Sequence, residues 1–314
     1  MTTLKTPDYS IVVPVFNSCE SLEELYHRIE KAMNGTGKSF EVLFIDDDSR
    51  DASWDKLQSL RERNPDHVTA IRLARNFGQH NATVCGIAQA SGTFIFTMDD
   101  DLQHPPEEMP KLIAVMELGD ADLVYGISDL KQHSVSRNLG SSAVKASSRH
   151  LFSSKGNGSS FRLLRSSLAK NLLNHQLNFI FIDELFNWYT NHIEFVQVEH
   201  HKRPYQKSTY TYHSLFSMFA NLVIYYTSIP LRAMVYGGFI SSFLSLLIGV
   251  WFIYRKIVHN VPLGFTALIV AVLFSTSIIL LSLGVIGEYL SRIYSVQNHK
   301  PPFAIKTLLR NDIS

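Results

Sequence analysis

Two long stretches without a charged residue constrain the fold of this chain more than any other feature. They run from Ala233 to Tyr254 and from Asn260 to Gly287. Each is long enough to cross the hydrocarbon core of a bilayer, about 30 Å thick, as a helix. Their length, small residues and aromatic ends predict a C-terminal two-helix transmembrane hairpin, with spans at about 233–254 and 262–287. A pair of buried core helices is the alternative that this composition disfavours.

The charges beside the hairpin predict its orientation. The linker carries two cations, Arg255 and Lys256. The flanking segments carry Lys202, Arg203, Lys207, Arg232, Arg292, Lys300, Lys306 and Arg310. Because cytoplasmic segments are enriched in Lys and Arg, we expect residues 1–210 to form a cytoplasmic domain, 232–290 the hairpin, and 291–314 a cytoplasmic tail.

Residues 211–231 are apolar and aromatic, and Pro230 interrupts them. We expect an interfacial amphipathic helix that leads into the first span. A third crossing is the alternative, which the short length disfavours. The chain is therefore expected to be an integral protein of the cytoplasmic (inner) membrane, with its large domain facing the cytoplasm.

The first two hundred residues alternate short β-prone runs with helical ones. Strands are expected at Ser10–Phe16, Phe40–Asp46, Val68–Leu73, Phe94–Met98, Leu123–Ile127 and Ile193–Val198. Helices are expected at Glu20–Met33, Ala52–Arg63, Gln79–Ala90, Glu107–Leu118 and Arg137–Phe152. This alternation predicts an α/β fold with a mostly parallel sheet and helices on both faces. Right-handed crossovers then bring the carboxyl ends of the strands to one edge.

Composition excludes several classes of protein. The net charge is +1, so nothing indicates a nucleic-acid partner. Cys19 and Cys85 have no metal-ligand spacing, which disfavours a zinc site or a disulfide framework. The N-terminus has no apolar run, so we expect no signal peptide.

The most informative strand end follows the apolar run Phe94–Met98. It stops in three carboxylates, of which Asp99 and Asp101 lean the same way in an extended segment. Open α/β sheets bind ligands at this edge, and Mg²⁺ and Mn²⁺ prefer carboxylate oxygens. The stretch therefore predicts a site for a metal and a diphosphate. The alternative is an acidic loop that caps the next helix, with Glu107 and Glu108 in its first turn.

Two more strand ends open onto the same edge. The first expected strand leads to Asn17 and Glu20, and the second ends in Asp46–Asp48. The chain has neither GxGxxG nor GxxxxGK[ST], so neither a dinucleotide fold nor a P-loop is supported. A nucleotide would then be held by carboxylates and a metal-bridged diphosphate, which suits a nucleoside-diphosphate sugar. Helix capping by Asp48 or Ser49 is the alternative, and we expect both readings to hold for different residues.

Seven motifs in order identify the chain as similar to a known family. They are Val13-Pro-Val-Phe-Asn17 with Glu20; Ile45-Asp-Asp-Asp-Ser49-x-Asp51; Arg75-Asn-Phe-Gly78 with Ala90-Ser-Gly92; Asp99-x-Asp101-Leu-Gln103-x-Pro-Pro-Glu107; Phe161-Arg-Leu163; Arg203-x3-Lys207-Ser208-x-Tyr210; and Gly287-Glu-Tyr-Leu-x-Arg292-Ile-Tyr294. The chain resembles the polyprenyl-phosphate glycosyltransferases of glycosyltransferase family 2, the group of dolichol-phosphate mannose synthase and the bactoprenol glucosyltransferases. The resemblance covers nearly the whole chain.

The resemblance implies a GT-A-like, Rossmann-type domain and gives roles to individual residues. It implies transfer of a sugar from a nucleoside-diphosphate sugar to a polyprenyl phosphate, with Mg²⁺ or Mn²⁺ as cofactor. The implied metal ligands are Asp99, Asp101 and Gln103. The implied nucleotide contacts are Pro14, Phe16, Glu20, Asp47, Asp99 and Asp100. The implied acceptor-phosphate ligands are Arg137, Ser141, Arg203, Lys207 and Ser208. The implied catalytic residues are Asp101, Arg137 and Arg203, and Asp183 is a further catalytic candidate, as a stand-in for a family residue that this chain lacks.

The chain departs from the family pattern at a few positions. Ser160 stands where the family usually has Asp, a candidate base or positioning group. Because a phosphate nucleophile is already an anion, we expect activity to survive and Ser160→Ala to cost little. Asp183 and Glu184 are candidate stand-ins. Asp48 replaces a usual Gly, Asp100 a usual Ala and Ser128 a frequent Arg; Asp100 is expected to point away from the metal.

The expected mechanism is one displacement, which inverts the anomeric carbon and which Asp101→Ala should abolish. One alternative is a processive polysaccharide synthase, disfavoured because neither its Gln-x-x-Arg-Trp motif nor further spans are found. Another is an inactive membrane scaffold, suggested by Ser160 and Ser128. The sequence leaves open which sugar and nucleotide are used and whether the protein forms a homo-oligomer.

Overall fold

The computed structural model divides the chain into two compact units. The first comprises Met1–Thr209 with Pro301–Ser314, and the second comprises Tyr210–Lys300. The described residues are 6–128, 159–173, 182–201, 229–259, 264–297 and 301–311.

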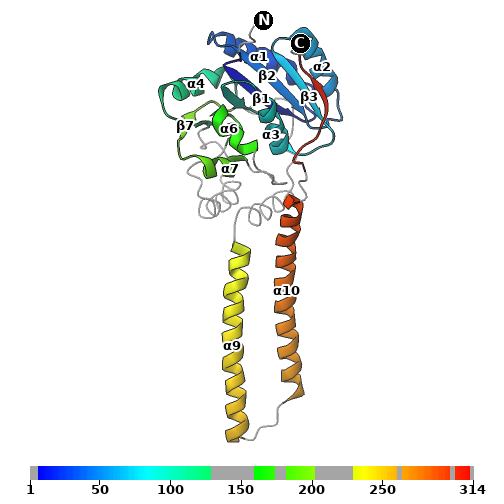
Figure 1. Ribbon diagram of the computed structural model, residues 1–314, viewed down its shortest axis with the longest axis vertical. Coiled ribbons are helices and arrows are strands. Elements are labelled where there is room, and N and C mark those ends of the chain that lie inside the picture. The colour runs from blue at the N-terminus through cyan, green and yellow to red at the C-terminus, as the bar shows by residue number, and fades with distance from the viewer. Residues whose placement is uncertain are drawn as a thin grey trace. The chain divides into compact units, whose positions relative to one another are not determined.

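The first unit contains one mixed sheet (Figure 1). Its eight described strands lie in the order β7-β5-β6-β4-β1-β2-β3-β8. The strands are β1 (Tyr9–Val15), β2 (Phe40–Asp46), β3 (Val68–Leu73), β4 (Phe94–Thr97), β5 (Leu123–Ile127), β6 (Arg162–Arg165), β7 (Ile193–Gln197) and β8 (Ile305–Leu309). The pairs β1–β2, β1–β4, β2–β3 and β5–β7 are parallel, whereas β6 and β8 run antiparallel to their neighbours. The expected mostly parallel sheet is confirmed.

Helices cover both faces of this sheet, also as expected. They are α1 (Leu22–Asn34), α2 (Ser53–Arg63), α3 (Gln79–Gln89), α4 (Met109–Leu118), α6 (Ser166–Leu173) and α7 (Ile182–Tyr189), with a single 3₁₀ turn, η1 (Pro106–Glu108), before α4. Helices α1, α2 and α4 share a core cluster with Val13 of β1 and Phe44 of β2. Helix α3 packs on the neighbouring residues Val12 and Ile45, which point to the opposite face because successive strand residues alternate.

A glycine lets α3 lie close against the sheet. A Cβ atom added to Gly86 would lie 2.3 Å from Cγ1 of Val12 and 2.6 Å from Cδ1 of Ile45. Both distances are shorter than any van der Waals contact, so α3 can approach the sheet this closely only because residue 86 is Gly. The approach fixes α3, whose first residues border the carboxyl edge of the sheet.

Three residues with left-handed backbone lie just beyond the carboxyl ends of three parallel strands. Asn17 follows β1 with φ 53°, Asp48 follows β2 with φ 58°, and Leu102 follows β4 with φ 57°. Asn and Asp adopt this conformation readily, whereas Leu does so at a cost. Leu102 is 2% exposed, and the burial of its side chain stabilises the turn after Asp99–Asp101. Such strain is typical of functional sites.

Two strands were not expected. β6 has only four residues and an Arg at each end, so its period-2 pattern is too short to recognise. β8 lies in the segment expected to be a tail, and it pairs with β3 through Ala70–Leu309 and Ile71–Leu308. The expected helix at 137–152 lies outside the described residues.

The second unit contains two long helices, α9 (Ile229–His259) and α10 (Phe265–Gln297), which contact each other. Large apolar side chains on both are exposed, among them Phe239 at 73% and Phe274 at 65%. Within the described residues, the window Phe274–Ser291 is long and apolar enough to span a membrane by length and composition. That both expected spans cross a bilayer stays a prediction.

Helix α9 begins a turn earlier than the first expected span. Pro230 lies in its first turn, where the missing N–H of proline costs no intrahelical hydrogen bond. The remainder of the expected interfacial helix, residues 211–228, lies outside the described residues.

Candidate active site

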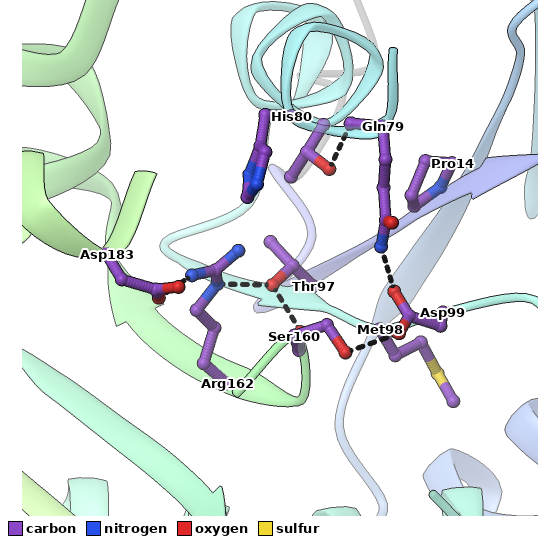
Figure 2. A pocket seen from close by; sticks show the side chains of 10 residues that line it. Pro14, Gln79, His80, Thr97, Met98, Asp99, Ser160, Arg162 and Asp183 are labelled. Atoms are coloured by element: carbon purple, nitrogen blue, oxygen red, sulfur yellow. Dashed lines mark hydrogen bonds and ion pairs between the residues drawn. The ribbon is translucent and has the colours of Figure 1, made fainter. Parts of the chain in front are cut away.

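A pocket opens where the carboxyl ends of β1 and β4 meet the first turn of α3 (Figure 2). It is lined by Pro14, Gln79, His80, Thr83, Thr97, Met98, Asp99, Ser160, Arg162 and Asp183. Its volume of about 50 Å³ is room for a few water molecules.

The carboxylate of Asp99 is held from two sides. The hydroxyl of Ser160 donates to Oδ2 at 2.6 Å, and the side-chain amide of Gln79 donates to Oδ1. Figure 2 shows Asp99 between these two donors. The two hydrogen bonds reach different oxygens of the carboxylate, so together they fix the carboxylate plane.

A second group of contacts joins the pocket residues Thr97, Arg162 and Asp183. The guanidinium of Arg162 donates through Nε to Oγ1 of Thr97 at 2.8 Å and through Nη1 to Oδ1 of Asp183. The hydroxyl of Tyr125 donates to the same Asp183 oxygen at 2.8 Å. Burial, together with the Asp183 charge, raises the pKa of Tyr125 well above its usual value. Tyr125 therefore stays protonated and acts as a donor.

His80 borders this group as a neutral imidazole. Its pKa is lowered to about 4, chiefly by burial; the Asp183 charge opposes this shift and the Arg162 charge adds to it. At neutral pH the pocket therefore contains one cationic guanidinium, the carboxylates and a neutral imidazole.

Asp100 faces a different part of the molecule from Asp99. Its Oδ2 accepts the backbone N–H of Phe16 at 3.1 Å, and its carbonyl accepts the hydroxyl of Ser21 at 2.6 Å. Burial is the main cause that raises the pKa of Asp100 to about 7. These contacts join the turn after β4 to the turn after β1. Asp100 was expected to point away from a metal at Asp99, and that expectation stays a prediction.

Asp101 and Gln103 form the next turn. The Oδ1 atom of Asp101 accepts the backbone N–H of Gln103 at 3.1 Å, and the Gln103 carbonyl accepts the backbone N–H of His201 at 2.8 Å. Between them lies the left-handed Leu102. The local hydrogen bond is an Asx-type turn, which holds the Asp101 carboxylate close to its own backbone.

The donor set of this turn fits a hard divalent cation held by few protein ligands. Among the described residues no group of three or more His, Cys, Asp or Glu side chains could hold a metal, so a cage built only from protein is not found there. Mg²⁺ is commonly bound by one or two carboxylates, with the remaining positions taken by water and phosphate. Asp99 and Asp101 are two carboxylates of the same turn, and their binding of a cation stays a prediction.

The carboxylate of Asp47 is hydrogen-bonded to the loop before α3. Its two oxygens accept the backbone N–H groups of Phe77 at 2.7 Å and Gly78 at 2.8 Å. Asp47 is 3% exposed, and burial raises the pKa of its carboxyl above the usual value. Because Gln79 follows directly, Asp47 positions the donor that contacts Asp99. A contact between Asp47 and a nucleotide stays a prediction.

The expected helix capping by Asp48 or Ser49 is wrong. Oδ1 of Asp51 accepts the N–H of Ser53, the first residue of α2, at 3.0 Å. Asp48 lies 3.6 Å from a guanidinium nitrogen of Arg72, and the Ser49 hydroxyl accepts the N–H of Asn17 at 3.0 Å. The N-cap position of α2 is occupied by Ala52, which makes no side-chain capping hydrogen bond.

The other expected nucleotide contacts lie on the same edge. Pro14 lines the pocket, Phe16 is 44% exposed, and Glu20 is exposed in the turn before α1. The expected phosphate ligands lie outside the described residues: Arg137, Ser141, Arg203, Lys207 and Ser208. None of these roles is tested, and all stay predictions.

Sequence reasoning did not single out the pocket residues Gln79, His80, Thr97 and Arg162. For Gln79 and His80 a signal was present, because they follow Arg75-Asn-Phe-Gly78 at the start of an expected helix. For Arg162 the signal was the Phe161-Arg-Leu163 motif, whose strand was too short to be expected.

Comparison with known proteins gives a consistent picture. The model of the family described as "Glycosyl transferase family 2" matches residues 10–188. The chain is 33% identical over 307 residues to the undecaprenyl-phosphate 4-deoxy-4-formamido-L-arabinose transferase of Pseudomonas savastanoi pv. phaseolicola, with 96% of this chain and 91% of that protein covered. It is 35% identical to the protein of that name from Pseudomonas fluorescens, with 96% and 90% covered.

A solved structure shows a similar fold. Glucosyl-3-phosphoglycerate synthase from Mycobacterium tuberculosis, in complex with uridine diphosphate, superposes with a TM-score of 0.51 at 16% identity. The superposition covers 69% of this chain and 78% of that one. At this identity the likeness concerns the fold alone, and it agrees with the expected GT-A-like arrangement.

Proposed function

This chain belongs to glycosyl transferase family 2, and from that premise we propose that it transfers a sugar from a nucleoside-diphosphate sugar to undecaprenyl phosphate or a closely related polyprenyl phosphate. The observation that carries the acceptor is the extent of the match. Relatives named as undecaprenyl-phosphate sugar transferases align over 96% of this chain, so the alignment reaches beyond the sheet to α9 and α10. A match confined to residues 10–188 would support the family alone.

We assign a divalent cation, Mg²⁺ or Mn²⁺, to Asp99 and Asp101, with Gln103 as a further oxygen ligand. When bound, the cation would offset the negative charge that grows on the leaving diphosphate. The residues of the chain prepare the site, because Ser160 and Gln79 fix the plane of the Asp99 carboxylate and the local turn holds Asp101.

The proposed chemistry is a single displacement with inversion at the anomeric carbon. The acceptor is a phosphate monoester and thus an anion at neutral pH, so the nucleophile needs no general base to remove a proton. This accounts for a site in which Ser160 occupies the position of the usual Asp. Arg137, Ser141, Arg203, Lys207 and Ser208 remain the proposed ligands of the acceptor phosphate, and they would supply rate by positioning it.

The connectivity of the chain supports the proposed membrane hairpin. The chain leaves the first unit near residue 209 and returns to it at residue 301, where β8 joins the sheet beside β3. If the second unit crosses a bilayer, both of its ends must lie on one side, because a folded sheet cannot be divided by a bilayer. This supports an even number of crossings, and therefore two spans over three. The positive flanks then support a cytoplasmic first unit.

The test is a transfer assay with the full chain purified in detergent. The protein receives undecaprenyl phosphate, Mn²⁺ and a panel of radiolabelled nucleotide sugars that includes a nucleoside-diphosphate 4-deoxy-4-formamido-L-arabinose. We expect a labelled product that partitions into the organic phase, depends on the lipid and disappears with EDTA. Sugar release without a lipid product would refute the acceptor. Neither binding nor turnover of any donor would favour the inactive scaffold.

A further inference from the structure

A row of buried polar side chains crosses three strands behind Asp99. Tyr125 of β5 and Thr97 of β4 are the register partners of Arg162 on β6, on its two sides. Directly opposed residues project from the same face of a sheet, so the three side chains stand side by side. They are 4%, 3% and 1% exposed for Tyr125, Arg162 and Thr97.

Asp183, on α7, is hydrogen-bonded to two members of this row. One carboxylate oxygen accepts from both the Tyr125 hydroxyl and the guanidinium of Arg162. Because a buried cation is costly unless it is paired and hydrogen-bonded, the Asp183 carboxylate offsets part of the cost of burying the Arg162 guanidinium. The guanidinium fork is rigid, so fixing Nη1 also fixes the direction of Nε.

The Nε atom of Arg162 is connected to Asp99 through a series of hydrogen bonds. It donates to Oγ1 of Thr97 at 2.8 Å, and that hydroxyl donates to the backbone carbonyl of Ser160 at 2.8 Å. The side chain of Ser160 then donates to Asp99. Figure 2 shows this chain of bonds running from Asp183 to Asp99 across the pocket.

We propose that Arg162 and Asp183 are positioning residues that set the orientation of the Asp99 carboxylate for metal binding, acting through Thr97 and Ser160. This inference rests on the proposed function, because it concerns the same metal site. It gives Asp183 a different role from the catalytic one expected of a stand-in for the Asp that Ser160 replaces. The carboxylate of Asp183 accepts hydrogen bonds from two donors inside the protein, Tyr125 and Arg162, and it acts on the metal site through them.

The decisive variant is Thr97→Val, which keeps the shape of the side chain and the Arg162–Asp183 pair but removes the hydroxyl that links them to Ser160. Its matched control is Thr69→Val, at a buried threonine of β3 remote from the pocket residues. The readout is the affinity for Mn²⁺ alone, measured by electron paramagnetic resonance of the free ion on the purified full chain. Circular dichroism and thermal unfolding establish that each variant is folded.

We expect Thr97→Val to weaken Mn²⁺ binding about 10-fold, within the range for groups that orient a metal ligand, and Thr69→Val to leave it unchanged. Asp183→Ala should weaken it similarly. Asp183→Asn retains an oxygen acceptor for Tyr125 and Arg162, so it should keep Mn²⁺ affinity within about threefold.

Two results would overturn the proposal. One is an unchanged Mn²⁺ affinity in folded Thr97→Val protein. The other is loss of transfer in both Asp183→Asn and Asp183→Ala with normal Mn²⁺ affinity, which would make Asp183 a catalytic base. Wild-type protein that binds Mn²⁺ but makes no lipid product would contradict the proposed function alone. The variant affinities would still decide the positioning role.

Discussion

Placing a second carboxylate beside Asp99 tests the electrostatics of the pocket. Ser160 donates a hydrogen bond to Asp99 at 2.6 Å, so the Ser160→Asp variant would bring a second negative charge to within about 4 Å of the first. Ser160→Asn is the matched control, because asparagine has nearly the same shape and no charge. The Thr97 bond to the Ser160 backbone carbonyl should persist in both.

The size of the effect follows from Coulomb's law. Two unit charges about 4 Å apart repel by about 4 kcal/mol at an effective dielectric constant of about 20. Asp99 is partly exposed, so solvent screening reduces this to about 2 kcal/mol. For a domain of this size that corresponds to a fall in Tm of about 4–8 °C relative to Ser160→Asn. A cation bound by both carboxylates would reverse the effect, because ligand binding to the native state stabilises it.

The assay is thermal unfolding of both variants at pH 8 with EDTA, at pH 8 with Mn²⁺, and at pH 4.5 with EDTA. We expect Ser160→Asp to be less stable than Ser160→Asn with EDTA at pH 8 and to gain more from Mn²⁺. At pH 4.5 the difference should shrink, because two adjacent carboxylates share a proton there. Equal Tm values at pH 8 with EDTA would refute the assignment of a charged Asp99 carboxylate at this position.

Three further predictions follow from buried groups. Asp47→Ala leaves two backbone N–H groups of the loop 77–78 unpaired, which should cost about 2–4 kcal/mol of unfolding free energy in denaturant titration; an unchanged midpoint would contradict this. His80 has a folded-state pKa of about 4, below its unfolded value, so its contribution to stability is complete above about pH 6.5 and is lost as pH falls towards 4. His80→Gln should therefore lose about 1–2 kcal/mol less than wild type between pH 7 and 4.5, and parallel pH profiles would refute the neutral imidazole. Gly86→Ala should destabilise by about 1–3 kcal/mol through overpacking against Val12, and a Tm equal to that of wild type would show that α3 can move away from the sheet.

The sequence predicts the core of the fold well because its strands are buried on both faces. All seven residues of β1 and of β2 are buried, and such strands read as continuous apolar runs bounded by turns. Helix α1 begins at Leu22, two residues after its expected start at Glu20, because a turn closed by a hydrogen bond from Ser21 to Ser18 precedes it. β6 and β8 escape prediction because each is recognised only by its pairing with a distant strand.

The site is predicted in part for a similar reason. Carboxylates at strand ends are visible in the sequence, and the structure brings Asp99 and Pro14 to one pocket. Which donors hold Asp99 is not visible, because Gln79 and Ser160 lie 20 and 61 residues away from it. Because the Ser160 hydroxyl holds the Asp99 carboxylate, Ser160→Ala should slow transfer by more than the small loss expected from the sequence.

The most direct test of the account compares initial rates of lipid-product formation by wild type, Asp101→Ala and Asp120→Ala. Asp120 is an exposed carboxylate between α4 and β5 and serves as the control. The account predicts that wild type and Asp120→Ala form labelled polyprenyl-phosphate sugar and stop with EDTA. Asp101→Ala should be slower by more than about 100-fold, the upper end of losses from groups one step removed from a metal. A fully active Asp101→Ala would contradict the assignment of the metal and diphosphate to this strand end.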